Sequence, residues 1–545
     1  MPTLDWIGKQ AVVNHHREVP YRLVHCDTDM SAGDPNAGNL LVQGDNLEAL
    51  RALLPYYAGK VKCVYIDPPY NTGGEDWVYN DNVNSPEIKA WLEKTVGKEG
   101  EDLSRHDKWL CMMYPRLRLL KEFLTPDGVV FINLDDNEHH TAKFICDEIF
   151  GRGAFIASII WQKIFAKKNK ARISVSHDYI LVYAMQGKKW DRNLIPRSSS
   201  QMEAYDNRDD DPRGVWQDVS LSVTSESEEK RREYRFPIQL PSGRSVDPPE
   251  GRHWNGLKPK IEELRKDNRL WFGPDGDNAP RLKVFLSEVQ GGIVPDTWWP
   301  HKEYGTNQDA KREIKEMFQG QEPFATPKPL KLIQQIIRIA TGENDIVMDA
   351  FAGSGTTAHA VLKQNSEDNG NRKFLLVEMD KHVATSVTGP RVQKAIEGYT
   401  AKNSKGKEFF VQGLGSGFRF CHLGKPLFDE FGDVAAEVTF PDLAAHIFFS
   451  ETGVPIPAKA KSELLGTYQG KAVYLLFDEA SAGAPRTVAG NVLTPERLAK
   501  LPKPPKGFEG ARVIYAEGCT VSAARLNAAY AVFKQIPYQV EGASR

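Results

Sequence analysis

Two short segments carry the side chains best suited to chemistry, and the first is Asp67-Pro68-Pro69-Tyr70. The apolar run Val61–Ile66, which predicts a strand, ends there in a carboxylate, two prolines and an aromatic ring. A carboxylate oxygen and the carbonyl oxygen of Pro68 can accept both hydrogens of one amino group, and the prolines fix the direction of that carbonyl. Two such acceptors would free the nitrogen lone pair of an exocyclic base amine for attack on a methyl group.

Tyr70 adds an aromatic ring on which such a base can stack. Stacking contributes about 1–3 kcal/mol per base, which offsets much of the few kcal/mol that swinging a base out of a duplex costs. The chain also contains Asp247-Pro248-Pro249, in a polar, turn-rich stretch with no strand before it and no ring after it. We interpret that second proline pair as a plain turn and the first as a clamp for one extruded base.

The second segment runs from Asp349 to Thr357 (DAFAGSGTT) and lies between a predicted strand and a predicted helix. Gly353 and Gly355 permit a tight turn, and the helix N-terminus behind them offers unpaired N–H groups. Glu378 ends the next predicted strand, where an acid can accept hydrogen bonds from two ribose hydroxyls. Together these features predict a nucleoside cofactor. The glycine-rich run 413–417 precedes a strand-like run instead of a helix, so we do not interpret it as a cofactor turn.

Alternating strand and helix patterns surround both segments, over residues 40–185 and again from about 309 to 400. Such alternation predicts a mostly parallel sheet covered by helices. The two strand tips, nearly three hundred positions apart in the chain, must then lie side by side and face one cleft. Between them, residues 186–305 are dense in turns and mixed charge, which indicates a separate module.

Length and composition limit the kinds of protein that this chain can be. A chain of 545 residues with 41% hydrophobic side chains is expected to form roughly two to four domains. The net charge of -2 argues against a general binder of polyanions but allows a local basic surface. No apolar run is long enough for a membrane helix, and no signal peptide or metal-ligand spacing is recognised. Six scattered cysteines, interpreted as small buried residues, are typical of a reducing, cytoplasmic compartment: Cys26, Cys63, Cys111, Cys146, Cys421 and Cys519.

The motifs resemble those of the amino-methylating DNA methyltransferases that use S-adenosylmethionine. In that family D-P-P-Y usually accompanies adenine N6, and its position before F-A-G-S-G resembles the β group. Further stretches look like the modification subunits of type III restriction–modification systems: DPPYNTG, LDDNEHH, SHDYILVYA, GTNQDAKREI, ATPKPLKLI and FRFCHLGKPLFDE.

The resemblance implies roles for individual residues. The reaction is expected to be carried by Asp67, Pro68, Pro69 and Tyr70. The cofactor, S-adenosylmethionine, is expected to lie among Asp45, Asp67, Lys328, Asp349, Phe351, Gly353, Gly355, Thr356 and Glu378, with Thr326 beside Lys328 at its methionine end. No metal is required.

The resemblance also implies the fold: a Rossmann-like class I methyltransferase sheet, circularly permuted, with an inserted target-recognition module and a C-terminal α+β accessory domain. The expected segments are an N-terminal extension (1–35), the catalytic half (36–185), the recognition module (186–308), the cofactor half (309–400) and an accessory or assembly domain (409–545).

Double-stranded DNA is the expected substrate, held by phosphate contacts from a basic turn. The residues of that turn are Lys163, Lys167, Lys168, Lys170 and Arg172. A restriction subunit or a second copy of the chain is the expected protein partner, docked on residues 409–545. Three alternatives stay open: methylation of cytosine N4, an RNA substrate, and a catalytically silent methyltransferase-like scaffold that binds DNA.

Overall fold

The computed structural model describes residues 3–72, 102–166, 171–224, 232–402, 408–429, 433–479 and 491–536. The chain divides into two compact units, a larger one of Met1–Asn193 and Asp296–Arg545 and a smaller one of Leu194–Pro295. The smaller unit lies inside the segment whose composition differs from its surroundings. No helix in the described part of the chain is long and apolar enough to cross a membrane.

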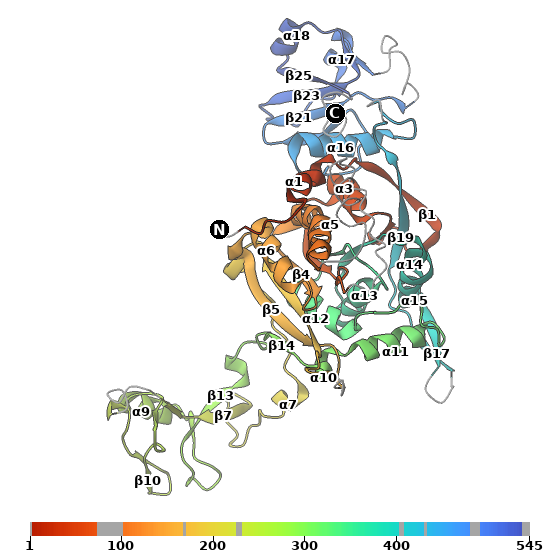
Figure 1. Ribbon diagram of the computed structural model, residues 1–545. Helices are drawn as coiled ribbons and strands as arrows, with labels where there is room; N and C mark the ends of the chain where they lie inside the picture. The colour runs from red at the N-terminus through yellow and green to blue at the C-terminus, as the bar shows by residue number, and fades with distance from the viewer. Residues whose placement is uncertain are drawn as a thin grey trace. The chain divides into compact units, whose positions relative to one another are not determined.

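A sheet of ten described strands forms the centre of the larger unit (Figure 1). Its order is β1-β19-β2-β16-β15-β3-β4-β6-β5-β14. Every junction from β19 to β4 is parallel, and β6 pairs antiparallel with both β4 and β5. The strands are β1 (Arg22–Gly33), β2 (Leu40–Gln43), β3 (Val61–Ile66), β4 (Leu124–Leu134), β5 (Phe155–Gln162), β6 (His177–Ala184), β14 (Trp298–Trp299), β15 (Ile346–Asp349), β16 (Lys373–Glu378) and β19 (Gly417–Pro426). The prediction of a mostly parallel α/β sheet is confirmed.

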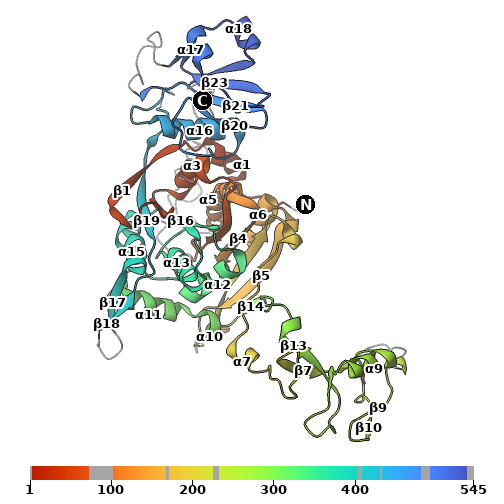
Figure 2. The same ribbon diagram turned by 180° about the vertical axis from the view of Figure 1, so that it is seen from behind.

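Two groups of helices flank this sheet (Figure 2). One consists of α3 (Asn46–Tyr57), α5 (Asp102–Phe123) and α6 (His139–Phe150), and the other of α12 (Leu330–Ala340), α13 (Thr356–Asp368) and α15 (Gly389–Glu397). Val64 and Met348 share one buried cluster with the first group. Because side chains alternate along a strand, the fully buried Tyr65 and Val347 face the second group. The strands that carry the two motifs are therefore buried on both faces.

The sheet also recruits strands from outside the two predicted catalytic segments. The N-terminal β1 pairs antiparallel with β19, which in turn lies beside β2. Cys26 and Cys421 are opposite each other in this pair and their sulfurs form a disulfide. The prediction that all six cysteines are small buried residues is therefore wrong for Cys26, which is exposed on the edge strand and bonded to Cys421.

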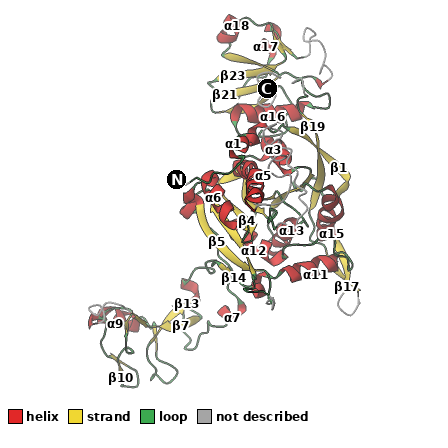
Figure 3. Cartoon of the chain, in the orientation of Figure 1, coloured by secondary structure: helices red, strands yellow, loops and turns green. Residues whose placement is uncertain are grey.

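The smaller unit has a core of its own, built from short strands and much loop (Figure 3). Its three-stranded sheet has the order β12-β13-β7, with bounds β7 (Trp216–Ser220), β12 (Leu270–Trp271) and β13 (Arg281–Phe285). Trp216 and Trp254 of this unit are buried. At the ends of the unit, Ile195 and Ile293 form an antiparallel bridge in which each N–H donates to the other carbonyl, at 2.9 and 2.8 Å.

Beyond β19 the chain forms a second, smaller sheet in the order β20-β21-β23-β25. These strands are β20 (Leu464–Tyr468), β21 (Lys471–Leu475), β23 (Ala511–Ala516) and β25 (Ala531–Gln535). Helix α16 (Phe440–Thr452) contacts β20 and β21 on one side and α3 on the other. Within the larger unit, α16 thus lies between the C-terminal strands and α3.

Candidate active site

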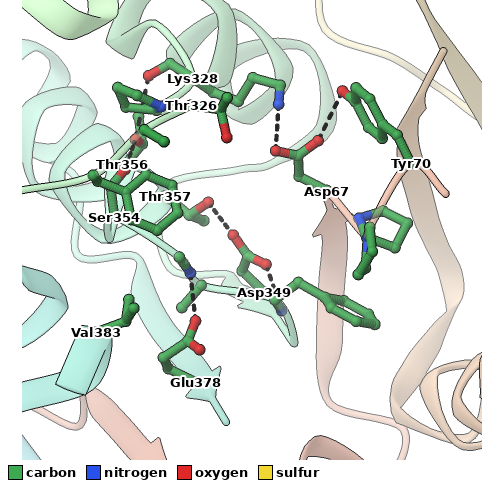
Figure 4. A pocket seen from close by; sticks show the side chains of 18 of the residues that line it. Asp67, Tyr70, Thr326, Lys328, Asp349, Ser354, Thr356, Thr357, Glu378 and Val383 are labelled. Atoms are coloured by element: carbon green, nitrogen blue, oxygen red, sulfur yellow. Dashed lines mark hydrogen bonds and ion pairs between the residues drawn. The ribbon is translucent and has the colours of Figure 1, made fainter. Parts of the chain in front are cut away.

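The two sequence motifs end neighbouring strands. β3 and β15 are parallel, with Met348 opposite Val64, so Asp67 and Asp349 emerge at the same edge of the sheet. Sheet positions where the strand order changes direction favour ligand binding at this carboxyl edge. A cavity of about 700 Å³ opens there, bounded by both motifs (Figure 4). Among the predicted residues that line it are Asp67, Pro68, Pro69, Tyr70, Thr326, Lys328, Asp349, Phe351, Gly353, Thr356 and Glu378.

Both carboxylate oxygens of Asp67 are engaged. Oδ1 accepts hydrogen bonds from the Tyr70 hydroxyl at 3.0 Å and from Asn133 Nδ2 at 3.2 Å. Oδ2 forms an ion pair with the Nζ of Lys328, a side chain only 9% exposed. The carboxylate is therefore held in one orientation from β3, from β4 and from the segment before α12.

The ring of Tyr70 is fixed between two acids. Its hydroxyl also lies 3.2 Å from Oδ2 of Asp178, a β6 residue whose other oxygen accepts from Lys163 Nζ at 2.6 Å. Burial raises the pKa of Tyr70 well above its usual range, and the nearby carboxylates of Asp67 and Asp178 raise it further. Tyr70 therefore stays neutral and presents an oriented aromatic ring to the cavity that it lines.

The backbone at the prolines is also anchored. Trp109 Nε1 of α5 donates to the carbonyl of Pro69 at 2.7 Å. No described residue donates to the carbonyl of Pro68, which lines the cavity. The Pro68 carbonyl thus remains available as an acceptor beside Asp67.

The carboxylate of Asp349 accepts hydrogen bonds from both ends of the glycine turn. Its Oδ1 accepts from the Phe351 N–H at 2.9 Å and its Oδ2 from the Thr357 hydroxyl at 2.5 Å. The side chain is 2% exposed, and burial raises its pKa to about 7 against the opposing effect of these two hydrogen bonds. Asp349 therefore ties β15 to the first turn of α13.

The glycine turn leaves no room for side chains. Gly353 has a φ of +50°, and a Cβ there would meet Phe324 Cζ at 3.0 Å. Gly355, at φ +76°, is the N-cap of α13. The Gly353 N–H donates to Oε2 of Glu378 at 2.7 Å, and burial raises the pKa of Glu378 to about 7. The turn thus brings backbone and the β16 carboxylate to the same wall of the cavity.

Several residues contact this site although no role in it was predicted for them from the sequence. Arg391 of α15 donates from Nη1 to Thr356 Oγ1 at 2.7 Å and is paired through Nη2 with Glu313 at 2.9 Å. Asn133 and Asp178 reach the Asp67–Tyr70 segment from β4 and β6. The sequence signal for Asn133 is its place near the end of β4, the neighbour of β3, and the signal for Asp178 is its place in the run SHDYILVYA.

Asp45 is placed differently from the other predicted cofactor residues. It caps α3 by accepting from the N–H groups of Leu47 and Glu48 at 2.9 and 3.1 Å, and Arg116 Nη2 lies 3.2 Å from its Oδ2. Neither Asp45 nor Gly355 is among the residues that line the cavity. Their contact with a cofactor stays a prediction.

The basic turn is described only in part. Lys163 lines the cavity and is paired with Asp178, so its ammonium group is directed at a carboxylate rather than held free on an exposed turn. Arg172 is exposed. Lys167, Lys168 and Lys170 lie outside the described residues.

The cavity offers the groups that S-adenosylmethionine requires. Glycine backbone at a helix N-terminus suits a carboxylate or a phosphate, and the buried carboxylate of Glu378 suits ribose hydroxyls. Asp67 supplies a negative charge for a sulfonium. A volume of about 700 Å³ lies within the range of small-molecule sites.

Residues 61–245 and 248–388 match the family model described as DNA methylase. The Mod subunit of the type III restriction-modification enzyme StyLTI, from Salmonella typhimurium strain LT2, is 34% identical over 401 residues, which are 70% of this chain and 59% of that protein. The Mod subunit of EcoPI, from Escherichia phage P1, is 30% identical over 502 residues, 82% of this chain and 74% of that one. The solved cytosine-N4-specific PvuII methyltransferase covers 66% of this chain and 89% of its own at 13% identity, with a TM-score of 0.33. The chain therefore spans 59% of the length of its Salmonella relative.

Proposed function

The chain belongs to the DNA methylase family, and we propose that it is a site-specific DNA methyltransferase that transfers a methyl group from S-adenosylmethionine to N6 of adenine. One observation carries the proposal: Asp67-Pro68-Pro69-Tyr70 and Asp349–Thr357, from adjacent parallel strands, line one cavity. The catalytic strand precedes the cofactor strand in the chain, which is the circularly permuted arrangement of a class I methyltransferase sheet.

The cofactor is held by the half of the cavity that β15, β16 and α13 form. Glu378 accepts the ribose hydroxyls, and the backbone at Gly353, which carries no Cβ, approaches the cofactor closely. Lys328 and Thr326 lie at the opposite wall, toward the methionine end. When bound, the cofactor supplies an electrophilic methyl group on a sulfonium.

The target base is held by the other half. Asp67 and the carbonyl of Pro68 accept the two N–H bonds of the exocyclic amine, which directs its lone pair at the methyl group. Tyr70 stacks on the base, and its hydroxyl bonds to Asp67 and Asp178 fix the ring for that purpose. Since the groups are already oriented, their main contribution to rate is positioning.

The decisive experiment is single-molecule sequencing of DNA from cells that express the chain or its Asp67→Ala variant. We expect N6-methyladenine at one short sequence with the unaltered chain and none with the variant, whose circular dichroism spectrum stays unchanged. Asp247→Ala is the matched control, because that acid also precedes two prolines but is exposed in the smaller unit. Methylation by the Asp67 variant would refute the assignment.

The sequencing data and two further assays separate the alternatives. N4-methylcytosine would identify the cytosine enzyme, and methylation of an RNA duplex in a transfer assay would identify an RNA enzyme. A silent scaffold would fail to bind labelled S-adenosylmethionine.

We place the chain in the cytoplasm as the modification subunit of a type III restriction–modification system. The Mod subunits of StyLTI and EcoPI are similar to it over 70% and 82% of this chain. Double-stranded DNA is the substrate, Leu194–Pro295 forms the core of the target-recognition module, and a restriction subunit or a second copy is the partner. Sedimentation velocity with and without that subunit tests the assembly, and a monomer under both conditions would contradict it.

Truncation at residue 409 is unsuited to testing the C-terminal region as an assembly domain. It would remove β19, which lies between β1 and β2 in the central sheet. Substitution of exposed side chains on the outer strand β25, such as Val532→Glu, leaves the sheet intact. Loss of assembly with this variant, without loss of cofactor binding, is the result we expect if the region docks a partner.

A further inference from the structure

A second cavity, of about 530 Å³, shares no lining residue with the active site. Its walls are the edge strand β1 and its neighbour β19, the C-terminal half of α3, the first turns of α16 and the loop at 456–460. Cavities of about 300–1,000 Å³ are typical of small-molecule sites. Nothing in the methyl-transfer chemistry uses this one.

The cavity has an excess of positive charge. Lys60, Arg419 and Lys459 line it, and no described residue forms a hydrogen bond or an ion pair with any of these three side chains. Arg22, the fourth cation, is paired with Glu48 at 2.9 Å. The one lining acid, Asp442, already accepts from the Thr439 hydroxyl at 2.5 Å as part of the α16 cap. An anion would therefore find three available cations and one engaged carboxylate.

Two of these cations are partly removed from water. The Nε of Arg419 is buried without a hydrogen-bond partner among the described residues. Burial also lowers the pKa of Lys60. A buried polar group without a partner is costly for the protein to maintain, so an anionic ligand would relieve an existing penalty at Arg419.

The remaining walls are aromatic and apolar. Tyr56 and Tyr57 of α3 line the cavity together with Leu40, Leu53 and Ile456. Burial raises the pKa of Tyr57, and the charge of Arg419 opposes that shift, so the guanidinium is close enough to influence the phenol. An aromatic ring and a guanidinium on neighbouring walls suit a planar ring that carries an anionic group.

We propose that this cavity binds a small phosphate ester with a planar ring, the chemistry of a nucleoside phosphate. Arg419 takes the phosphate through the planar fork of its guanidinium, with Lys60 and Lys459 as further charges. Tyr56, Tyr57 and the apolar wall take the ring. The site is separate from that of the methyl donor, so both ligands bind at once.

Isothermal titration calorimetry on the full chain tests this, with adenosine diphosphate, adenosine and inorganic phosphate as probes. We expect saturable binding of the diphosphate, and at least tenfold weaker binding of the other two probes because each lacks half of the recognised chemistry. Arg419→Gln should weaken the binding of adenosine diphosphate at least tenfold. Glu378→Gln changes the first cavity. Its affinity for adenosine diphosphate should stay within twofold of that of the unaltered chain, which would exclude binding of this probe at the cofactor site.

Lys60→Met provides a second, independent variant, because this exposed side chain has no described partner to lose. This variant should weaken the binding of adenosine diphosphate about threefold or more, with an unchanged melting temperature. It tests the proposal independently if Arg419→Gln does not fold. The proposal is overturned if no probe binds, if Lys60→Met binds the diphosphate like the unaltered chain, or if Glu378→Gln alone abolishes binding.

Discussion

The Nζ of Lys328 forms an ion pair with Oδ2 of Asp67 across the active-site cavity, although 261 positions separate the two residues in the chain. The same ammonium group lies 5.1 Å from the centroid of the Tyr70 ring. One lysine from the segment before α12 thus contacts both side chains that we propose bind the target base. It couples the two halves electrostatically.

Lys328→Met is therefore expected to lower the rate of methyl transfer at least tenfold while the chain stays folded. Loss of the cation removes the ion pair that holds Oδ2 of Asp67 in one orientation, and positioning is the main contribution of these groups to rate. Single-turnover methyl transfer measures the effect.

Lys331→Met is the matched control, since Lys331 is an exposed lysine in the first turn of α12. It should change the rate less than twofold. An equal loss in both variants would mean that Lys328 acts through general charge and not through Asp67.

Thr357→Val should destabilise the fold by about 1–3 kcal/mol, because it leaves the buried Asp349 without one hydrogen-bond donor. The loss of stability should be larger at pH 8 than at pH 6. The pKa of Asp349 lies at about 7, and a buried carboxylate needs hydrogen-bond donors more when it is ionised. Urea unfolding at the two pH values measures it. Ser366→Ala, on the exposed end of the same helix, should change stability by less than about 0.5 kcal/mol.

Cofactor affinity should rise as the pH is raised from 6 to 8. Burial raises the pKa of Glu378 to about 7 from the usual 4.5, so the carboxylate needed to accept ribose hydroxyls forms only in this range. Up to about tenfold tighter binding follows from one such group. Glu378→Gln should remove most of this slope, and a slope that persists unchanged would exclude Glu378 as its cause.

The same raised pKa has the opposite effect on the ligand-free fold. Because the native state holds the proton of Glu378 more tightly than the unfolded chain does, its contribution to stability is present below pH 4.5 and is lost as the pH rises toward 7. As the pH rises toward 7, the affinity for the cofactor should therefore increase while the free energy of unfolding of the ligand-free chain decreases.

Replacing residues 196–292 by Gly-Gly should leave a folded chain that binds S-adenosylmethionine within about twofold of the full chain. Ile195 and Ile293 exchange two backbone hydrogen bonds, and such an antiparallel pair can be closed by a two-residue turn. The smaller unit has its own core, and none of its residues belongs to the buried cluster of the central sheet. Sequence-specific methylation should be lost, which radiolabel transfer to target and non-target duplexes measures.

The sequence was sufficient to predict the strands that position the site. Val61–Ile66 is a strand with the predicted bounds, and the run around Asp349 is a strand followed by a helix that begins at Thr356. Local patterns determine these elements: an apolar run for each buried strand, and glycines at positive φ before the helix. That both tips line one cavity follows from parallel pairing, because parallel strands end at the same edge.

The contacts between distant segments could not be predicted in this way. Asp178 sits in an ordinary apolar strand, and only the antiparallel pairing of β6 with β4 brings it to Tyr70. The β1–β19 pair joins residues 395 positions apart at Cys26 and Cys421. The ion pair of Lys163 likewise depends on Asp178 of β6, so the basic run alone could not predict it, and its contact with DNA stays a prediction.

The closed bridge at Ile195 and Ile293 has a consequence for how related proteins diverge. An inserted region whose two ends already meet can be exchanged whole by recombination between homologous genes, without any change in the register of the strands that do the chemistry. Lineages that carry this scaffold could therefore acquire new sequence preferences in one step, while the machinery for the transfer itself is inherited unchanged.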